Sequence, residues 1–216
     1  MTANDDQQSS PELIIGAAEL RDLARAKLVD TRDTTHGDHM LNPGFSDWVV
    51  KNAVTPAAVL IPLVERSDDL QFVFTKRTAH LKSHSGQIAF PGGKIDAQDQ
   101  DAVSAALREA HEEIDLDPHH VEIIGNLPDY FTGSGYRISP VLALVDGNTQ
   151  LHPNPDEVEY IFEVPMSFLM NVDNHHMGSR KFKGSDRYFY EMPYQEHYIW
   201  GVTAGIVRMM HEKLFK

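Results

Sequence analysis

Glu109, Glu112 and Glu113 are the residues whose type and spacing most strongly suggest chemistry. On a helix, residues three and four apart share one side, so these carboxylates would fall within an arc of roughly 100°. Carboxylate oxygens are the ligands that hard cations such as Mg²⁺ prefer. A glutamate-rich helix can also be a solvated acidic surface without any ligand. The residues around the glutamates decide between these interpretations.

The helix expected to carry the glutamates is amphipathic. Its apolar residues recur at spacings of three and four and predict one core-facing stripe beside the acidic flank: Val103, Ala106, Leu107, Ala110 and Ile114. The glutamates occupy the last turns before Asp115 and Pro118, where an anion is disfavoured by roughly 0.3–1 kcal/mol. Arg108 is the only basic residue one turn away. This imbalance favours a divalent cation as the partner of the acidic flank.

A glycine turn precedes the predicted helix. The residues from Phe90 to Gly93 predict a chain reversal whose glycines let main-chain carbonyls approach a ligand closely. A phosphate-binding P-loop is excluded because Ile95 follows Lys94 where Ser or Thr is needed, and Ile88 stands where the first glycine belongs. The turn is therefore expected to contribute to a metal site.

The turn and helix together resemble the Nudix box, G-x5-E-x7-R-E-U-x-E-E-x-G-U with U aliphatic, which is found in hydrolases of nucleoside diphosphates linked to other groups. The run from Arg108 to Ile114 fits the centre of that pattern. Three departures stand out: one extra residue separates Gly93 from Arg108, Asp99 occupies the first glutamate position, and Asp115 replaces the late glycine. Because aspartate tolerates left-handed backbone, Asp115 is still expected to end the helix.

The longer spacing is similar to that of the coenzyme A diphosphatase branch of the family. Residues 75–93, TKRTAHLKSHSGQIAFPGG, resemble the additional motif of that branch. The resemblance implies hydrolysis of coenzyme A to 3′,5′-ADP and 4′-phosphopantetheine, and it makes Lys76, Arg77, His84 and Gln87 the candidate substrate-binding residues. For His84, packing beside the glycine turn is an equal alternative.

The resemblance also implies a mechanism. Glu109, Glu112 and Glu113 would hold Mg²⁺ or Mn²⁺ against the diphosphate while a water attacks one phosphorus. The carbonyl of Gly92 or Gly93 would help them, and Gly93 is included in the predicted metal set. Arg108 is expected to reach a carboxylate near the turn. The general base would be a glutamate of the box or a later acid, with Glu157 and Glu159 as candidates and Glu157 included in the predicted catalytic set.

Two other functions remain open at this point. The enzyme could be a Nudix diphosphatase for another nucleotide, such as NADH, ADP-ribose or a dinucleoside polyphosphate. A regulator that binds a nucleotide without turnover is disfavoured, because the glutamates are intact and no DNA-binding motif accompanies them.

The composition narrows the remaining classes. The chain has 216 residues, 41% of them hydrophobic, and a net charge of −13, which argues against nucleic acid as a partner. Cysteine is absent, so a thiol nucleophile is excluded, as is the catalytic cysteine on which the isoprenoid diphosphate isomerases of this fold rely. Because the chain shows neither a signal peptide nor a membrane-length apolar run, a cytoplasmic protein without a membrane partner is predicted. The resemblance also implies that the protein is a homodimer.

The predicted fold is α/β, a Nudix-type α/β/α sandwich with a mixed β-sheet. Residues 1–45 are predicted to form an extension with a disordered start and one short helix, and residues 46–216 the Nudix domain. Strands are expected at residues 56–64, 70–74, 121–124, 138–145 and 159–164, a hairpin around Gly184, and helices at 165–170 and 202–214. The first strand is apolar enough to be central.

Overall fold

The structure is a computed structural model and describes residues 14–29, 36–45, 47, 49, 51, 54–66, 69–80, 85–182 and 184–216. The predicted disordered start lies outside these residues. Among the residues that are described, no helix has both the length and the apolar character needed to cross a bilayer.

The central strand of the main sheet is β2 (Thr55–Arg66). It runs antiparallel to β3 (Asp69–Arg77) and β5 (Gly92–Lys94) and parallel to β8 (Tyr136–Val145). Alternate residues of β2 enter opposite cores, as expected for a strand covered on both faces. The predicted central position and the mixed sheet are therefore confirmed.

The rest of the main sheet extends from these strands in both directions. Its longest path is β1-β7-β8-β2-β3-β4, with β5 on β2, β6 on β8 and β9 on β3 as branches. The additional strands are β1 (His36–Gly37), β4 (Ile88–Ala89), β6 (Val121–Asn126), β7 (Tyr130–Phe131) and β9 (Val158–Pro165). The expected strands are thus present, and each is longer than predicted.

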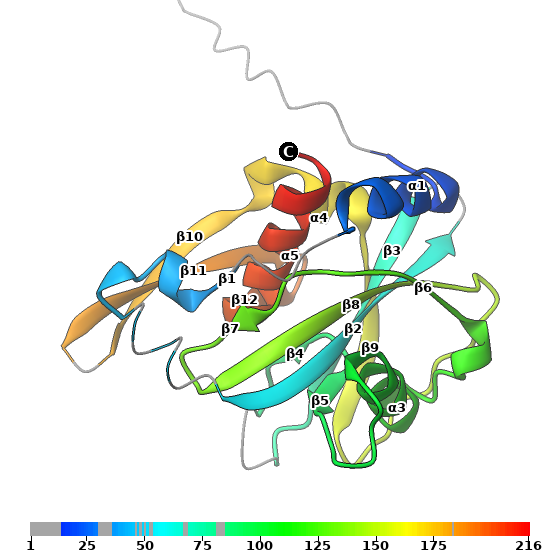
Figure 1. Cartoon of the computed structure of the whole chain (residues 1–216), viewed down its shortest axis with the longest axis horizontal. Coiled ribbons are helices and arrows are strands. Elements are labelled where there is room, and N and C mark those ends of the chain that lie inside the picture. Colours follow the sequence, from blue (N-terminus) through cyan, green and yellow to red (C-terminus); the bar gives the residue numbers. More distant parts are fainter. Residues whose placement is uncertain are drawn as a thin grey trace, which may run out of the picture.

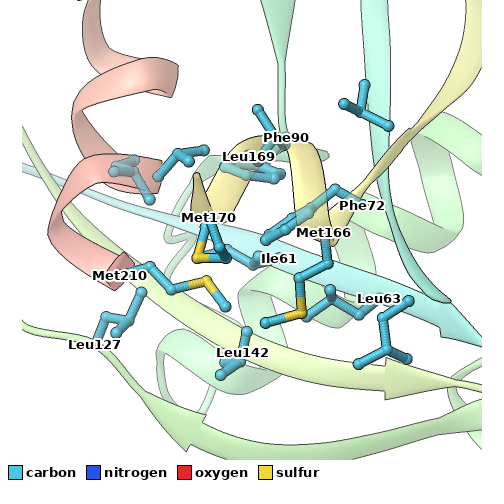
Figure 2. Packing of buried hydrophobic residues seen from close by; sticks show 14 of the residues in the cluster. Ile61, Leu63, Phe72, Phe90, Leu127, Leu142, Met166, Leu169, Met170 and Met210 are labelled. Atoms are coloured by element: carbon cyan, nitrogen blue, oxygen red, sulfur yellow. The ribbon is translucent and has the colours of Figure 1, made fainter. Parts of the chain in front are cut away.

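Helices cover both faces of the main sheet, which confirms the predicted sandwich. On one face lies α3 (Ala102–Ile114), and on the other lie α1 (Ala17–Lys27), α4 (Met166–Met170) and α5 (Gly201–Leu214) (Figure 1). The core beneath α5 contains Phe72, Phe90 and several methionines, including Met166, Met170 and Met210 (Figure 2). Short 3₁₀ turns occur at Asp38–Met40, Pro43–Phe45, Pro118–His120 and Val172–Asn174.

A second sheet projects beside α5. It consists of β10 (His176–Phe182), β11 (Ser185–Tyr194) and β12 (His197–Trp200), all antiparallel. The predicted hairpin around Gly184 is confirmed, but it is longer than expected and carries a third strand. Met192 and Ile199 are fully buried in the core that α5 covers. One face of this small sheet therefore packs against the core, and the other face points away from the core.

The N-terminal segment joins the two sheets. Strand β1 pairs with β7, and Asp38 accepts hydrogen bonds from the Tyr130 hydroxyl at 3.0 Å and the Gly133 N–H at 2.8 Å. Asn42 donates its side-chain amide to the Tyr188 carbonyl and accepts from the Tyr188 N–H, both at 3.0 Å. The short helix predicted in residues 1–45 is α1, and it buries Leu20 in the common core. The division after residue 45 stays a prediction.

Candidate active site

Helix α3 has well-defined ends. Its N-cap Asp101 accepts a hydrogen bond from the Ser104 N–H at 2.8 Å, while the Ser104 hydroxyl accepts from the Asp101 N–H at 3.0 Å. Asp115 ends the helix in the left-handed conformation, with φ 55° and ψ 31°. The expectation that Asp115 can replace the glycine is therefore confirmed.

The buried face of α3 is wider than the predicted stripe. Ala105, Ala106, Ala110 and Ile114 are buried, while Val103 and Leu107 are only partly covered. Glu113 belongs to the buried set, with 2% of its side chain exposed, whereas Glu109 is 17% and Glu112 52% exposed. The three glutamates therefore do not lie on one uniform flank but run from the core to solvent.

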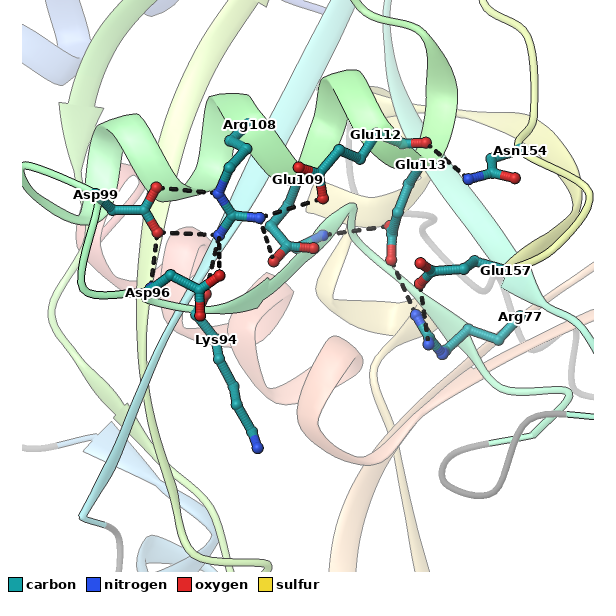
Figure 3. A network of polar contacts seen from close by, with 11 residues as sticks. Arg77, Lys94, Asp96, Asp99, Arg108, Glu109, Glu112, Glu113, Asn154 and Glu157 are labelled. Atoms are coloured by element: carbon teal, nitrogen blue, oxygen red, sulfur yellow. Dashed lines mark hydrogen bonds and ion pairs between the residues drawn. The ribbon is translucent and has the colours of Figure 1, made fainter.

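Arg108 organises one half of the site. Its Nε and Nη2 donate to the two carboxylate oxygens of Asp99 at 3.0 and 2.9 Å, and Nη2 also reaches the Lys94 carbonyl at 3.2 Å. Its Nη1 lies 2.9 Å from Glu109 and 3.2 Å from Glu112 (Figure 3). The expectation that Arg108 reaches a carboxylate near the turn is confirmed. Asp99, which stands at the first glutamate position of the pattern, accepts from Arg108 through both of its carboxylate oxygens.

Arg77 organises the other half. Its Nη1 donates to Glu113 Oε1 at 2.9 Å, and its Nη2 lies 3.6 Å from Glu157 Oε2 (Figure 3). The second oxygen of Glu113 accepts from the Gly92 N–H at 3.3 Å. Arg77 was predicted to bind substrate, but its observed partners are carboxylates of the site. Sequence reasoning had treated Arg108 as the only nearby basic residue and missed this contact.

The carboxylates remain electrostatically unfavourable despite both arginines. Burial is the main cause that raises the pKa of Glu113 to about 7, with Glu109 and Glu157 adding to the shift against the opposing Arg77 charge. Burial likewise raises the pKa of Glu109, which Arg108 opposes and Glu112 and Glu157 reinforce. Neighbouring carboxylates thus raise the pKa of both acids. Such a cluster is short of positive charge, which a divalent cation would supply.

Close contacts surround the two glycines of the turn, and at Gly92 the contact with backbone leaves no room for a side chain. A β-carbon on Gly93 would collide with the carboxylate of Glu109, and one on Gly92 would collide with the backbone of β2. Glu109 therefore packs directly against the main chain of the turn. The carboxylates and the main-chain carbonyls of the turn are oxygen donors, the kind of ligand that suits Mg²⁺ or Mn²⁺. Among the described residues, however, no three acidic or histidine side chains already converge on one point, because the arginines hold them.

Glu157 and Glu159, the two candidate general bases that follow α3 in the chain, lie in different environments. Glu157 lies beside Arg77 and influences the pKa of Glu109 and Glu113, whereas Glu159 pairs with Lys76 at 3.3 Å. The Lys76 ammonium also lies over the Tyr160 ring, 5.1 Å from its centre. Of the two late candidates, only Glu157 thus lies with the α3 glutamates.

A cavity of about 1000 Å³ begins at the glycine turn. One side is lined by residues of the segment between β3 and β5, including Arg77, Gln87, Gly92, Gly93 and Lys94. A further part of the lining comes from the second sheet: Arg180, Phe182, Arg187, Phe189 and Trp200. The glutamates do not line this cavity but lie behind β5, and Lys76 does not line it either. His84 lies outside the described residues.

The second-sheet residues were missed in the sequence. In each strand of the hairpin an arginine is followed two residues later by a phenylalanine, Arg180 by Phe182 and Arg187 by Phe189. This pattern suggests a basic and aromatic surface, but only the strand register shows that the two strands share it on one face.

Comparison with known proteins gives consistent matches. Residues 54–183 match the NUDIX domain. A protein named "Uncharacterized Nudix hydrolase NudL" from Enterobacter sp. (strain 638) is 38% identical over 185 residues, which cover 83% of this chain and 95% of the relative. Its namesake from Escherichia coli (strain K12) is 38% identical over 152 residues, or 70% and 79% of the two chains. The crystal structure of the Nudix hydrolase RenU from M. smegmatis is 21% identical and covers 51% of this chain and 70% of that one, with a TM-score of 0.44.

Proposed function

Because the chain belongs to the Nudix family of hydrolases, which cleave diphosphate bonds in nucleoside diphosphate derivatives, we propose that its substrate is coenzyme A or an acyl derivative of it. The products would be 3′,5′-ADP and 4′-phosphopantetheine.

The observation that carries this proposal is the position of residues 75–93, the segment that resembles the coenzyme A motif. It runs from β3 through β4 to β5, and it supplies much of one wall of the cavity: Arg77, Gln87, Ile88, Ala89, Phe90, Gly92 and Gly93. The same segment contacts Glu113 of α3 through Arg77 and Gly92. The motif thus adjoins both the cavity and the acidic site behind β5.

Glu109, Glu112 and Glu113, with the Gly93 carbonyl, would hold Mg²⁺ or Mn²⁺ at the β5 edge of the cavity. When bound, such a cation neutralises charge on the diphosphate and lowers the pKa of bound water. Glu109 and Glu112 would then exchange contacts that they now make with Arg108. Arg108 would keep its bidentate pair with Asp99, which fixes the helix relative to the turn.

Glu157 is the general base in this proposal. Its side chain is 44% exposed, beside Arg77 and within electrostatic reach of Glu109 and Glu113. Glu157 would accept the proton of a water that attacks one phosphorus in line, while the bond from that phosphorus to the bridging oxygen breaks and the second phosphate leaves. Two monophosphates result, and no covalent enzyme intermediate forms.

A substrate panel tests the proposal. Purified protein is incubated with coenzyme A, NADH, ADP-ribose and diadenosine polyphosphates, each with Mg²⁺, with Mn²⁺ and with a chelator, and the products are separated. We expect the highest kcat/KM for coenzyme A, release of 3′,5′-ADP, and loss of activity with the chelator. Equal or better cleavage of another nucleotide would overturn the choice of substrate. The homodimer stays a prediction, which sedimentation of the purified protein would check.

A further inference from the structure

The outer face of the second sheet is the part of the cavity that the proposed chemistry does not use. Strand register places Arg180 opposite Arg187, Gly178 opposite Phe189, and Glu191 opposite Trp200. Residues directly opposite in an antiparallel pair share a face. We define the arginine-aromatic face as the residues of this side that line the cavity: Arg180, Phe182, Arg187, Phe189 and Trp200.

The charges on the two sides of this hairpin are arranged differently. On the opposite side, Lys181 faces Asp186, a complementary pair. On the cavity side, Arg180 faces Arg187, so two cationic side chains share this face at one position of the register. Both line the cavity, where their charge is complementary to an anion. Arginine also suits a phosphate in particular, because its planar group can donate two parallel hydrogen bonds.

The aromatic residues of the face provide a platform beside the arginines. The Phe189 and Trp200 rings meet edge to face with centres 5.2 Å apart, and the Arg180 guanidinium lies 5.7 Å from the centre of the Trp200 ring. Phe182, at the end of β10, is 52% exposed. Aromatic rings of this kind bind nucleobases by stacking, and the neighbouring cation holds the attached phosphate.

The location of the face separates it from the reaction centre. The glycine turn and the arginine-aromatic face both line one cavity, so a ligand whose diphosphate lies at the turn would place another part of itself on this face. A chain with a net charge of −13 repels anions in general. Two opposed arginines in such a chain therefore mark a local site for negative charge.

We propose that the arginine-aromatic face binds the nucleoside end of the substrate, with the base on Trp200 and Phe189 and a ribose phosphate, distinct from the bond to be cleaved, between Arg180 and Arg187. The inference rests on the proposed function in one respect: it assumes that a nucleotide occupies the cavity. It adds the requirement that the ribose carries its own phosphate. Such a group is the 3′-phosphate of coenzyme A or the 2′-phosphate of a phosphorylated dinucleotide.

Binding of product-like ligands tests the inference without turnover. Calorimetry on the metal-free protein would compare adenosine 3′,5′-bisphosphate, adenosine 2′,5′-bisphosphate and AMP. We expect a bisphosphate to bind at least about tenfold more tightly than AMP. Arg180→Gln and Arg187→Gln should each remove most of that preference and leave the affinity for AMP nearly unchanged. Arg25→Gln, a matched loss of charge at an exposed position of α1, should leave the preference intact.

The outcomes distinguish this inference from the proposed function. Hydrolysis of coenzyme A by a protein that binds AMP and both bisphosphates equally would overturn the inference alone. A preference for a bisphosphate that survives both arginine substitutions would also overturn it. A preference that the substitutions remove, in a protein that does not cleave coenzyme A, would support the face and overturn the proposed substrate. Tighter binding of the 2′,5′-bisphosphate would support the face and identify a 2′-phosphorylated nucleotide as its ligand.

Discussion

The acidic site at α3 and the arginine-aromatic face handle charge in opposite ways. The glutamates are paired within the chain with Arg108 and Arg77, although these two arginines do not balance all of their charge, and one of the glutamates is buried. The arginines of β10 and β11 face each other across a hairpin and border an open cavity. Charges compensated internally fix geometry, so their loss should alter stability and turnover together. The loss of charges that are directed at a cavity should alter only the affinity for the ligand.

The largest effect is expected at Glu113. Glu113→Gln keeps the side-chain volume and an acceptor for the Gly92 N–H, but it removes the charge that would hold the cation. We expect kcat with coenzyme A to fall by roughly 1000-fold while the fold survives. Glu19→Gln on the exposed surface of α1 is the matched control and should leave kcat unchanged. An unchanged kcat in Glu113→Gln would remove this residue from the metal role.

The pH dependence of stability gives the second largest effect. The folded pKa of Glu113 is about 7 against an ordinary value of 4.5, so between these values the folded chain holds a proton that the unfolded chain has lost. The metal-free protein should therefore lose up to about 3 kcal/mol of unfolding free energy from this residue as the pH rises from 4.5 to 7. Urea unfolding of wild type and Glu113→Gln across this range would measure it. Parallel pH profiles would contradict the buried charge.

Arg108→Lys tests whether internal compensation fixes geometry. Lysine keeps the charge but cannot pair with both oxygens of Asp99. We expect a loss of about 2 kcal/mol in unfolding free energy, together with a lower kcat, because the helix is no longer fixed against the turn. Arg21→Lys, at an equally bidentate but exposed pair with Glu122, should cost less than about 1 kcal/mol. Equal losses at both positions would contradict the distinction.

The smallest effect is expected at the edge of the arginine-aromatic face. Phe182→Ala should raise KM for coenzyme A about threefold through lost apolar contact, with kcat and stability nearly unchanged. Met177→Ala is the control, because Met177 lies on the same strand, is similarly exposed and points to the opposite side. Steady-state kinetics of both variants with coenzyme A would measure these KM and kcat values. A fall in kcat without a change in KM would place Phe182 in the reaction rather than in binding.

The sequence predicted the parts of the molecule that local patterns determine. The helix carrying Glu109 and Glu112, its end at Asp115, the central strand and the sandwich were all expected and observed. The contact of Arg108 with a carboxylate near the turn, which is that of Asp99, was also predicted, from the resemblance to the Nudix box. These features depend on residues close together in the chain or on a strong apolar pattern.

Features that depend on distant segments were not predicted. The helical spacing predicts Glu113 on the acidic flank of α3. In the structure Glu113 is buried in the core, where it forms an ion pair with Arg77 from β3. Lys76 lies next to Arg77 in sequence yet pairs with Glu159, because alternate residues of a strand point to opposite sides. The arginine-aromatic face requires the register of β10 on β11, which the sequence of neither strand contains.

The paired hydrogen bonds between Asn42 and the Tyr188 backbone have a consequence for aggregation. Strand β11 pairs with β12 only from Glu191 onward, so at Tyr188 its outer edge would otherwise offer a free N–H and carbonyl. An amide side chain that satisfies both groups blocks the addition of a foreign strand at this point. Asn42→Ala should therefore promote self-association through this edge while the hydrophobic core, including Leu20 of α1, stays intact.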